Sequence, residues 1–160
     1  KLMGGEEKFV NRLQKIFDDS LYNATNEPNI AFPFLFNYVK GEEWRTQETV
    51  RNLIDNEFGI GPKGIPGNDD TGTMSAWLIF AMMGFYPDCP GNPEYQLCTP
   101  VFEEVTINLP EGKEFVIKTL RENPKNNRIK NVMLNGQDYD RFQLNHRDII
   151  SGGKITFLCE

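Results

Sequence analysis

Two adjacent carboxylates, Asp69 and Asp70, stand between glycines in residues 67–77 (GNDDTGTMSAW), directly before a strongly apolar stretch. Aspartate disfavours helix interiors and favours the loop and N-cap that precede a helix. A carboxylate in that position stands free of the helix body, where backbone N–H groups and the positive end of the helix dipole stabilise its charge. Such a residue suits a functional acid. It also suits an ordinary helix cap, which is the interpretation that the local pattern alone favours.

A second candidate pair, Asn26 and Glu27, lies in an earlier loop that leads into a helix. Residues 23–33 and 59–72 both lead into helices, and one helical hairpin separates them. If consecutive helices run antiparallel, the two loops return to the same rim of a helical barrel. Two acidic loops that meet there would form a site for a sugar, a divalent cation or both. The alternative, which position alone favours, is that each acid caps only its own helix.

Trp44 stands among charged residues and is the best candidate for an exposed aromatic platform. Most other aromatic residues of the first half fall at helical spacing, which favours core packing. The single histidine, His146, stands beside Arg147 and Asp148 and is interpreted as a surface residue rather than a catalytic one. No nucleophile elbow, phosphate-binding loop, zinc-protease motif or dinucleotide fingerprint occurs.

Three cysteines, Cys89, Cys98 and Cys159, carry little functional signal. None lies in a CxxC pair, which with a single histidine argues against a zinc site. Cys89 and Cys98 flank a loop rich in proline and glycine and could pair in an oxidising compartment. Small buried thiols are the favoured interpretation.

The candidate residues need helices to position them, and the first half of the chain has the apolar spacing of helices. Phe9, Leu13, Ile16 and Phe17 form one helical stripe. Further helices are predicted over residues 33–39, 47–58 and 71–84. The last of these is apolar nearly all round, which is typical of the inner member of a helical pack.

Beyond Pro87 the apolar pattern takes the alternation of strands. Strands are predicted over residues 95–97, 101–109, 115–117 and 155–158. Asn135 and Gly136 predict the turn of a hairpin. The predicted fold class is therefore α plus β, with a helical segment over 1–86 and a small antiparallel β-sandwich module over 87–160.

The totals fit a globular protein of one domain or two small ones, with 160 residues, 39% of them hydrophobic. A net charge of −6 argues against nucleic acid as a partner. No apolar run reaches the length of a membrane span, so none is expected. The sequence begins with Lys1 and shows no signal peptide, which indicates a piece of something longer.

Several motifs together closely resemble the end of glycoside hydrolase family 92. Residues 67–77 carry the most specific of them. The others are spread over essentially the whole chain: LMGG at 2–5, NEP at 26–28, FNY at 36–38, WRTQETVR at 44–51, MGFYP at 83–87, CPGNPEY at 89–95, LNG at 134–136 and GGKITF at 152–157.

This resemblance implies a calcium-dependent α-mannosidase that works with inversion on mannose-containing glycans. The family folds as an N-terminal β-sandwich and an (α/α)6 barrel, with the active site between them. The chain would then comprise the last barrel helices and the closing β module. It would need the upstream portion of the same protein as its partner. A secreted, periplasmic or cell-surface location is also implied, because glycans are degraded outside the cytoplasm.

The resemblance also implies roles for particular residues. Asp70 would be the catalytic base or lie close to it, and Asn68 and Asp69 would support the same water and metal network. Glu27, with Asn26, would lie near the calcium ion and the sugar hydroxyls. Inversion needs a carboxylic acid and a carboxylate about 6.5–9.5 Å apart, so that a water molecule fits between base and sugar. Calcium prefers oxygen ligands and would hold vicinal hydroxyls of the mannose ring.

Two departures from the family pattern limit what this chain does alone. The general acid of the family lies upstream of residues 2–5, so the isolated chain is expected to be inactive. Many members with α-1,2 specificity carry a histidine and an acid where this chain has Ile30 and Ala31. An apolar pair cannot make those hydrogen bonds, which argues against α-1,2 linkage and leaves other linkages or leaving groups open.

Two functions from other classes compete with the enzyme. A non-catalytic carbohydrate-binding module would bind mannosides through its β half, regardless of a mutation at Asp70. A purely structural fragment of a nicked enzyme would be accompanied by a second polypeptide in the same preparation. The fragment interpretation also predicts exposed apolar surface on the helix at residues 71–84.

Overall fold

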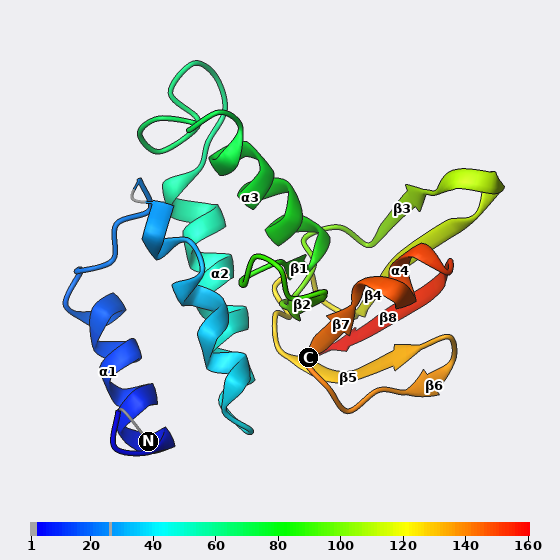
Figure 1. Ribbon diagram of the computed structural model, residues 1–160, viewed down its shortest axis with the longest axis horizontal. Coiled ribbons are helices and arrows are strands. Elements are labelled where there is room, and N and C mark those ends of the chain that lie inside the picture. Colours follow the sequence, from blue (N-terminus) through cyan, green and yellow to red (C-terminus); the bar gives the residue numbers. More distant parts are fainter. Residues whose placement is uncertain (1–2, 26) are drawn as a thin grey trace.

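The structure is a computed structural model that describes residues 3–25 and 27–160. The longer helices occupy the first half, and the second half consists mainly of strands (Figure 1). The elements before residue 84 are α1 (Glu6–Asp18), the 3-10 helices η1 (Glu27–Asn29) and η2 (Phe32–Tyr38), α2 (Glu43–Glu57) and α3 (Thr73–Met83). Those that follow are β1 (Phe85–Tyr86), β2 (Glu94–Leu97), β3 (Glu104–Asn108), η3 (Pro110–Gly112), β4 (Glu114–Arg121), β5 (Ile129–Leu134), β6 (Gln137–Asp138), β7 (Gln143–Asn145), α4 (His146–Ile150) and β8 (Gly153–Cys159).

Each helix predicted in the first half is present, but the boundaries differ from the predicted ones for local reasons. The helix predicted over 33–39 is the 3-10 helix η2, with proline at its start. α2 begins at Glu43 rather than residue 47, and the Glu43 carboxylate accepts a hydrogen bond from the N–H of Gly41 at 2.8 Å. α3 begins at Thr73 rather than residue 71, because the two residues before Gly72 have positive φ and cannot continue a helix.

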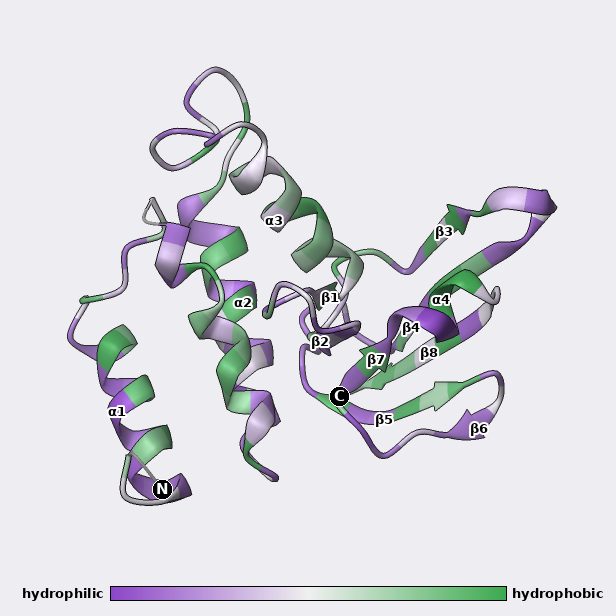
Figure 2. Cartoon of the chain, viewed as in Figure 1, coloured by the Kyte–Doolittle hydropathy of each residue, from purple (hydrophilic) through white to green (hydrophobic). Residues whose placement is uncertain are grey.

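α3 packs one face against the helical core and leaves another face open. Met74, Trp77 and Ala81 are each at most 1% exposed, and the Trp77 indole donates to the carbonyl oxygen of Ile30 at 2.9 Å. Ile79, on the same helix, is 57% exposed. Figure 2 shows hydrophobic colouring along much of α3. The helix thus has the exposed apolar surface that the fragment interpretation predicts, in addition to its buried face.

The strands form a three-stranded sheet of order β1-β2-β7 and a five-stranded sheet of order β3-β4-β8-β5-β6. The prediction of a wholly antiparallel module is wrong at one ladder, because β4 and β8 run parallel, from Phe115 opposite Gly153 to Arg121 opposite Cys159. The long connection through β5, β6, β7 and α4 makes this possible, since parallel neighbours need a crossover. The hairpin predicted at Asn135–Gly136 is confirmed between β5 and β6.

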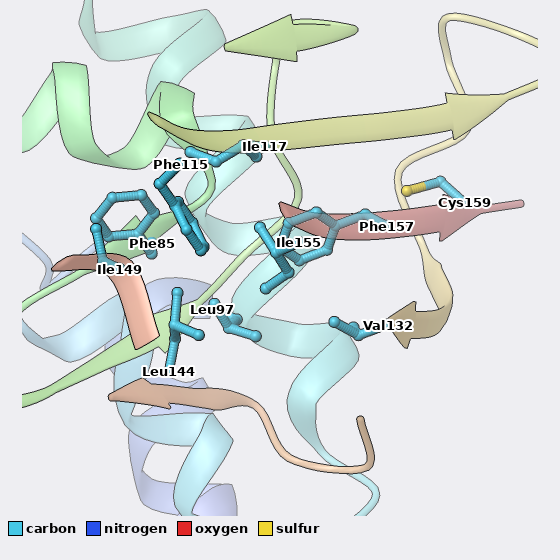
Figure 3. Close-up of a cluster of buried hydrophobic side chains, with 10 residues drawn as sticks. All are labelled: Phe85, Leu97, Phe115, Ile117, Val132, Leu144, Ile149, Ile155, Phe157 and Cys159. Atoms are coloured by element: carbon cyan, nitrogen blue, oxygen red, sulfur yellow. The ribbon is translucent and has the colours of Figure 1, made fainter. Parts of the chain in front are cut away.

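The two sheets share one apolar core (Figure 3). Phe85, Leu97 and Leu144 come from the smaller sheet, and Phe115 and Phe157 come from the larger one. All five are at most 3% exposed. Burying side chains of this size supplies about 1.5–3 kcal/mol each, so this cluster is a main source of stability for the β half.

Polar contacts join the helical and β halves. The buried Asn37 amide of η2 donates to the Leu97 carbonyl at 2.8 Å, and the Gln143 amide donates to the Asn37 carbonyl at 3.0 Å. β1 lies at residues 85–86, before the predicted boundary at 86/87, and pairs with β2 beyond it. Among the described residues, no helix combines the length and apolar character needed to cross a membrane.

Candidate active site at the acid loop

The first of the two adjacent aspartates caps α3. Residues 67–72 are called the acid loop below. In it, the Asp69 carboxylate accepts a hydrogen bond from the backbone N–H of Ser75 at 2.8 Å. The Asp69 carbonyl accepts bonds from the N–H groups of Gly72 and Met74 at 3.1 and 3.2 Å. Asp69 therefore satisfies N–H groups that the first turn of any helix leaves unpaired.

The second aspartate is placed differently. Asp70 has a φ of 48° and Thr71 a φ of 59°, so two consecutive residues with side chains adopt the left-handed region. The Asp70 N–H donates a hydrogen bond to the Asn68 side-chain oxygen at 3.3 Å. The backbone carbonyl of Asp70 accepts a hydrogen bond from the Thr73 hydroxyl at 2.8 Å. Within the described part of the chain, no hydrogen bond engages the Asp70 carboxylate. A half-buried acid held by its backbone, with its carboxylate uncommitted, is well arranged for proton transfer.

The acid loop meets the loop that carries the second candidate pair. A Cβ built on Gly67 would lie 2.7 Å from the Thr25 Cβ, so the Thr25 side chain packs directly against the Gly67 backbone. Gly67 also has a φ of 67°, which favours glycine. The predicted convergence of the loop at residues 23–33 with the loop at residues 59–72 is thereby confirmed at Thr25 and Gly67, and Figure 1 shows both loops at the same end of the helices.

Glu27 lies on that second loop and borders a pocket of about 320 Å³. The carboxylate is exposed, and Tyr86, Asp88, Ile30 and Ala31 line the same pocket. Asn26, its predicted partner, lies outside the described residues. The pocket opens between η1 and the connection that follows β1.

The structure does not bring Trp44 to the acid loop. Trp44 lies in the first turn of α2, whereas the acid loop follows the other end of that helix. α2 has 15 residues, which at a rise of 1.5 Å each make it about 22 Å long. The Trp44 ring lies against the guanidinium groups of Arg45 and Arg128, at 4.5 and 4.7 Å from its centroid. These cations cover a ring that was predicted to be an open platform.

Tyr86 and Asp88 belong to the pocket but were not singled out from the sequence. The Tyr86 ring stacks on Phe34 at 4.8 Å, and only 9% of the residue is exposed. Burial, with the nearby Asp88 and Glu27 carboxylates, raises the pKa of Tyr86 to about 12. The Tyr38 hydroxyl donates to Asp88 Oδ2 at 2.9 Å. The available signal was their position within and beside the motif at residues 83–87, which carries the resemblance without assigning them a role.

The histidine and cysteines take no part in this site. His146 is exposed as predicted, and its Nδ1 lies 2.9 Å from the Tyr95 hydroxyl. The three cysteines are free, so Cys89 and Cys98 do not pair in this structure. Cys98 is fully buried, which raises the pKa of its thiol, while Cys89 is exposed.

Side chains that commonly bind metals do not cluster in the described part of the chain. Within residues 3–25 and 27–160, no three histidine, cysteine, aspartate or glutamate side chains gather closely enough to hold an ion. Calcium takes six to eight oxygen ligands. Glu27 offers an accessible carboxylate, which is one of the oxygen ligands that calcium prefers.

Comparison with known proteins identifies the family. The sequence model of the glycosyl hydrolase family 92 catalytic domain matches residues 1–159. An uncharacterized secreted glycosidase from Arthroderma benhamiae is 34% identical over 157 residues, covering 96% of this chain and 20% of the relative.

Solved structures agree with this comparison. A family GH92 α-mannosidase from Bacteroides thetaiotaomicron superposes with a TM-score of 0.90 at 34% identity, covering 98% of this chain and 22% of its own. A family GH92 inverting mannosidase from the same organism gives a TM-score of 0.90 at 33% identity, covering 99% and 25%. This chain spans only a fifth to a quarter of the length of these relatives. The chain belongs to glycosyl hydrolase family 92.

Proposed function

We propose that this chain forms the C-terminal part of an α-mannosidase that removes terminal α-linked mannose from glycans with inversion of configuration. The observation that supports this proposal is that the two adjacent aspartates of the acid loop have different hydrogen-bonding roles. Asp69 caps α3, whereas the Asp70 carboxylate has no hydrogen-bond partner among the described residues and stands where two loops converge. The solved relatives are named as mannosidases, one of them inverting, which favours the same chemistry here.

Asp70 would act as the general base. Its carboxylate would take a proton from water as that water attacks the anomeric carbon from the face opposite the leaving oxygen. The general acid would come from the portion of the protein upstream of this chain, across the gap of about 6.5–9.5 Å that inversion requires. Asn68 would fix the backbone of Asp70 through the 3.3 Å hydrogen bond.

Calcium would bind beside this base rather than within this chain alone. Glu27, with Asn26, would supply one or two of its oxygen ligands, and the upstream portion would supply the others. When bound, the ion contributes positive charge that holds the hydroxyls of the sugar. The apolar Ile30 and Ala31 at the neighbouring pocket disfavour α-1,2 linkage. A location outside the cytoplasm is proposed on the likeness to the secreted fungal glycosidase.

The deciding experiment measures mannose release from α-linked mannobioses by the full-length protein. The wild type is compared with Asp70→Asn, each with and without a calcium chelator. Loss of a general base costs about 10²–10⁴-fold in kcat, and we expect the chelator to lower activity until calcium is restored. The isolated 160-residue chain should release no mannose. Activity that survives both changes would mean that the acid loop is only a helix cap.

The competing carbohydrate-binding function makes a separate prediction. A binding module would retain mannoside affinity in the Asp70→Asn variant and show no turnover in the full-length wild type. Mannose release by the full-length wild type distinguishes the two, because a binding module predicts none, whereas retained affinity of Asp70→Asn is compatible with both functions.

A further inference from the structure

Two contacts join the segment around the short turn η1 to the acid loop and to α3, which follows that loop. In the first, the Thr25 side chain packs directly against the backbone of Gly67. In the second, the Trp77 indole donates its N–H to the carbonyl oxygen of Ile30 at 2.9 Å. Thr25 precedes η1 and Ile30 follows it, while Gly67 opens the acid loop and Trp77 lies on α3 just beyond it. Each segment is therefore held on both sides of its acidic residue.

The Trp77 indole is fixed in the position that this hydrogen bond needs. Trp77 is 1% exposed, and its acceptor residue Ile30 is 9% exposed. The Phe58 ring stacks on the indole, with ring centroids 5.4 Å apart and ring planes 7° apart, and the Phe34 ring meets it edge-on at 6.0 Å. A buried N–H group without an acceptor is costly, so the bond ties the backbone of Ile30 to α3.

The turn between the two contacts has little else to hold it. No residue of η1 is buried, and both Glu27 and Pro28 are exposed. The Asn29 amide donates to the carbonyl oxygen of Asn23 at 3.5 Å, and the Ile30 N–H donates to the carbonyl oxygen of Glu27 at 3.2 Å. Both bonds stay within the same segment, and the hydrogen bonds of a 3-10 turn have poorer geometry than those of an α-helix. The place of Glu27 therefore depends on the contacts at the two ends of its turn.

We propose that Trp77 is a positioning residue of the active site, whose indole N–H fixes the turn that carries Glu27 relative to the loop that carries Asp70. The proposal rests on the mannosidase activity proposed above, in which these two carboxylates serve one reaction. Because Trp77 is almost fully buried, it acts through the backbone of Ile30 and not by contact with a sugar. Catalysis is sensitive to such placement, since a shift of about 1 Å costs up to about a hundredfold in rate.

The test compares Trp77→Phe with the wild type in the full-length protein. Phenylalanine keeps an aromatic ring against Phe58 but has no N–H to donate. Hydrogen exchange in the peptide that contains residues 27–31 should become up to about tenfold faster, because loss of one hydrogen bond lowers the free energy of local opening. Mannose release from an α-linked mannobiose, expressed per folded molecule, should fall at least about tenfold. The loss should lie mainly in kcat rather than KM, because misplaced carboxylates slow the chemical step.

The matched control is Phe157→Leu, which also reduces a buried aromatic side chain but lies in the core of the β half. It should lower the thermal midpoint while leaving exchange at residues 27–31 and kcat per folded molecule unchanged. An equal fall of kcat in this control would show that the loss follows general destabilisation and would refute the positioning role.

The remaining outcomes separate the proposal from the activity on which it rests. Unchanged exchange in Trp77→Phe would show that the indole does not hold the turn. Faster exchange with unchanged kcat would show that the placement of the turn does not matter for the reaction. Either result refutes the role of Trp77 and leaves the mannosidase activity standing. A wild type that releases no mannose would instead refute that activity and with it the catalytic role of Trp77, whatever the exchange rates.

Discussion

The carboxylate of Asp69 accepts the backbone N–H of Ser75 at 2.8 Å, which ties the first of two adjacent aspartates to the start of α3. Its neighbour Asp70 has a left-handed backbone, with a φ of 48°, and no hydrogen bond engages its carboxylate among the described residues. The two residues are alike in charge and adjacent in sequence, yet only one carboxylate is used by the fold. Their effects on stability and on activity should therefore separate.

Substitution at the two positions tests that separation. Asp69→Ala removes a helix cap and should lower stability by about 1 kcal/mol, seen as a lower thermal midpoint of the full-length protein. Asp70→Asn should leave the midpoint nearly unchanged, because asparagine tolerates the left-handed region, while kcat falls at least about a hundredfold. Equal destabilisation by the two changes would contradict the assignment of the cap to Asp69 alone.

Because the two loops are in close contact at Gly67, substitution of Gly67 should disturb the acid loop more than substitution of Gly72. Gly67→Ala would place a methyl group 2.7 Å from the Thr25 Cβ, whereas Gly72→Ala meets no atom within 4 Å. Both glycines have positive φ, at 67° and 94°, so both variants bear the backbone cost of about 1–2 kcal/mol. Only Gly67→Ala should also displace the acid loop.

Activity distinguishes the two glycine variants. A displacement of about 1 Å at a catalytic group costs up to a hundredfold in rate, so Gly67→Ala should lose at least about tenfold more kcat than Gly72→Ala. Mannose release by the full-length variants, normalised to folded protein, provides the measurement. Similar kcat values for both would mean that Thr25 does not position the loop.

Local signals predicted much of the fold. The stripe that includes Phe9 and Leu13 is decided within one helix, and the turn at Asn135–Gly136 within one hairpin, where φ values of 52° and 81° match the residues present. The parallel pairing of β4 with β8 could not be predicted in this way. It joins Phe115 to Gly153 through a connection whose path is set by packing, not by the alternation of either strand.

The candidate site could be predicted only in part from the sequence. The convergence of the two acidic loops follows from helix connectivity, and the resemblance singled out Asp70. One hydrogen bond to Ser75 decides which aspartate caps the helix, and the sequence pattern is the same either way. Tyr86 was missed because no sequence pattern indicates that it lines the same pocket as Glu27, which lies 59 residues earlier in the chain.

Alkaline pH should destabilise the protein through Tyr86. Its pKa is about 12 in the folded state, against an ordinary value near 10. Between these values the folded state holds a proton that the unfolded chain has released, so the free energy of unfolding falls as pH rises from about 10 to 12. Below about pH 9 this contribution is fully present.

Thermal midpoints of full-length wild type and Tyr86→Phe at pH 8, 10 and 11 measure this effect. The variant lacks the titrating group and should lose less of its midpoint over that range than the wild type. Tyr95→Phe is a weaker comparison, because burial raises the pKa of Tyr95 as well. Parallel curves for Tyr86→Phe and wild type would show that Tyr86 does not titrate differently on folding.

Thiol labelling should distinguish the three cysteines. Cys89 is exposed, whereas Cys98 is fully buried and the pKa of its thiol is raised by that burial. Cys159 is 5% exposed, and the pKa of its thiol is raised for the same reason. Brief treatment of the native full-length protein with iodoacetamide should modify Cys89 and leave the other two until the protein unfolds. Peptide mass mapping reads the result, and a Cys89–Cys98 disulfide in that map would contradict the structure.

A buried amide of α2 makes one of the polar contacts that join the two halves. Gln47 of α2 is 3% exposed, its side-chain oxygen accepts the N–H of Ile129 at 2.9 Å, and its carbonyl accepts the Asn127 amide at 2.9 Å. Gln47→Ala would leave the Ile129 N–H without its acceptor, which costs about 1–3 kcal/mol. Glu48→Gln is the matched control, since it breaks only the half-exposed ion pair with Arg128, worth about 0–1 kcal/mol. Thermal midpoints of the two full-length variants should therefore differ, with Gln47→Ala clearly lower. If Glu48→Gln proved the more harmful change, the ion pair and not the buried amide would hold the β half against α2.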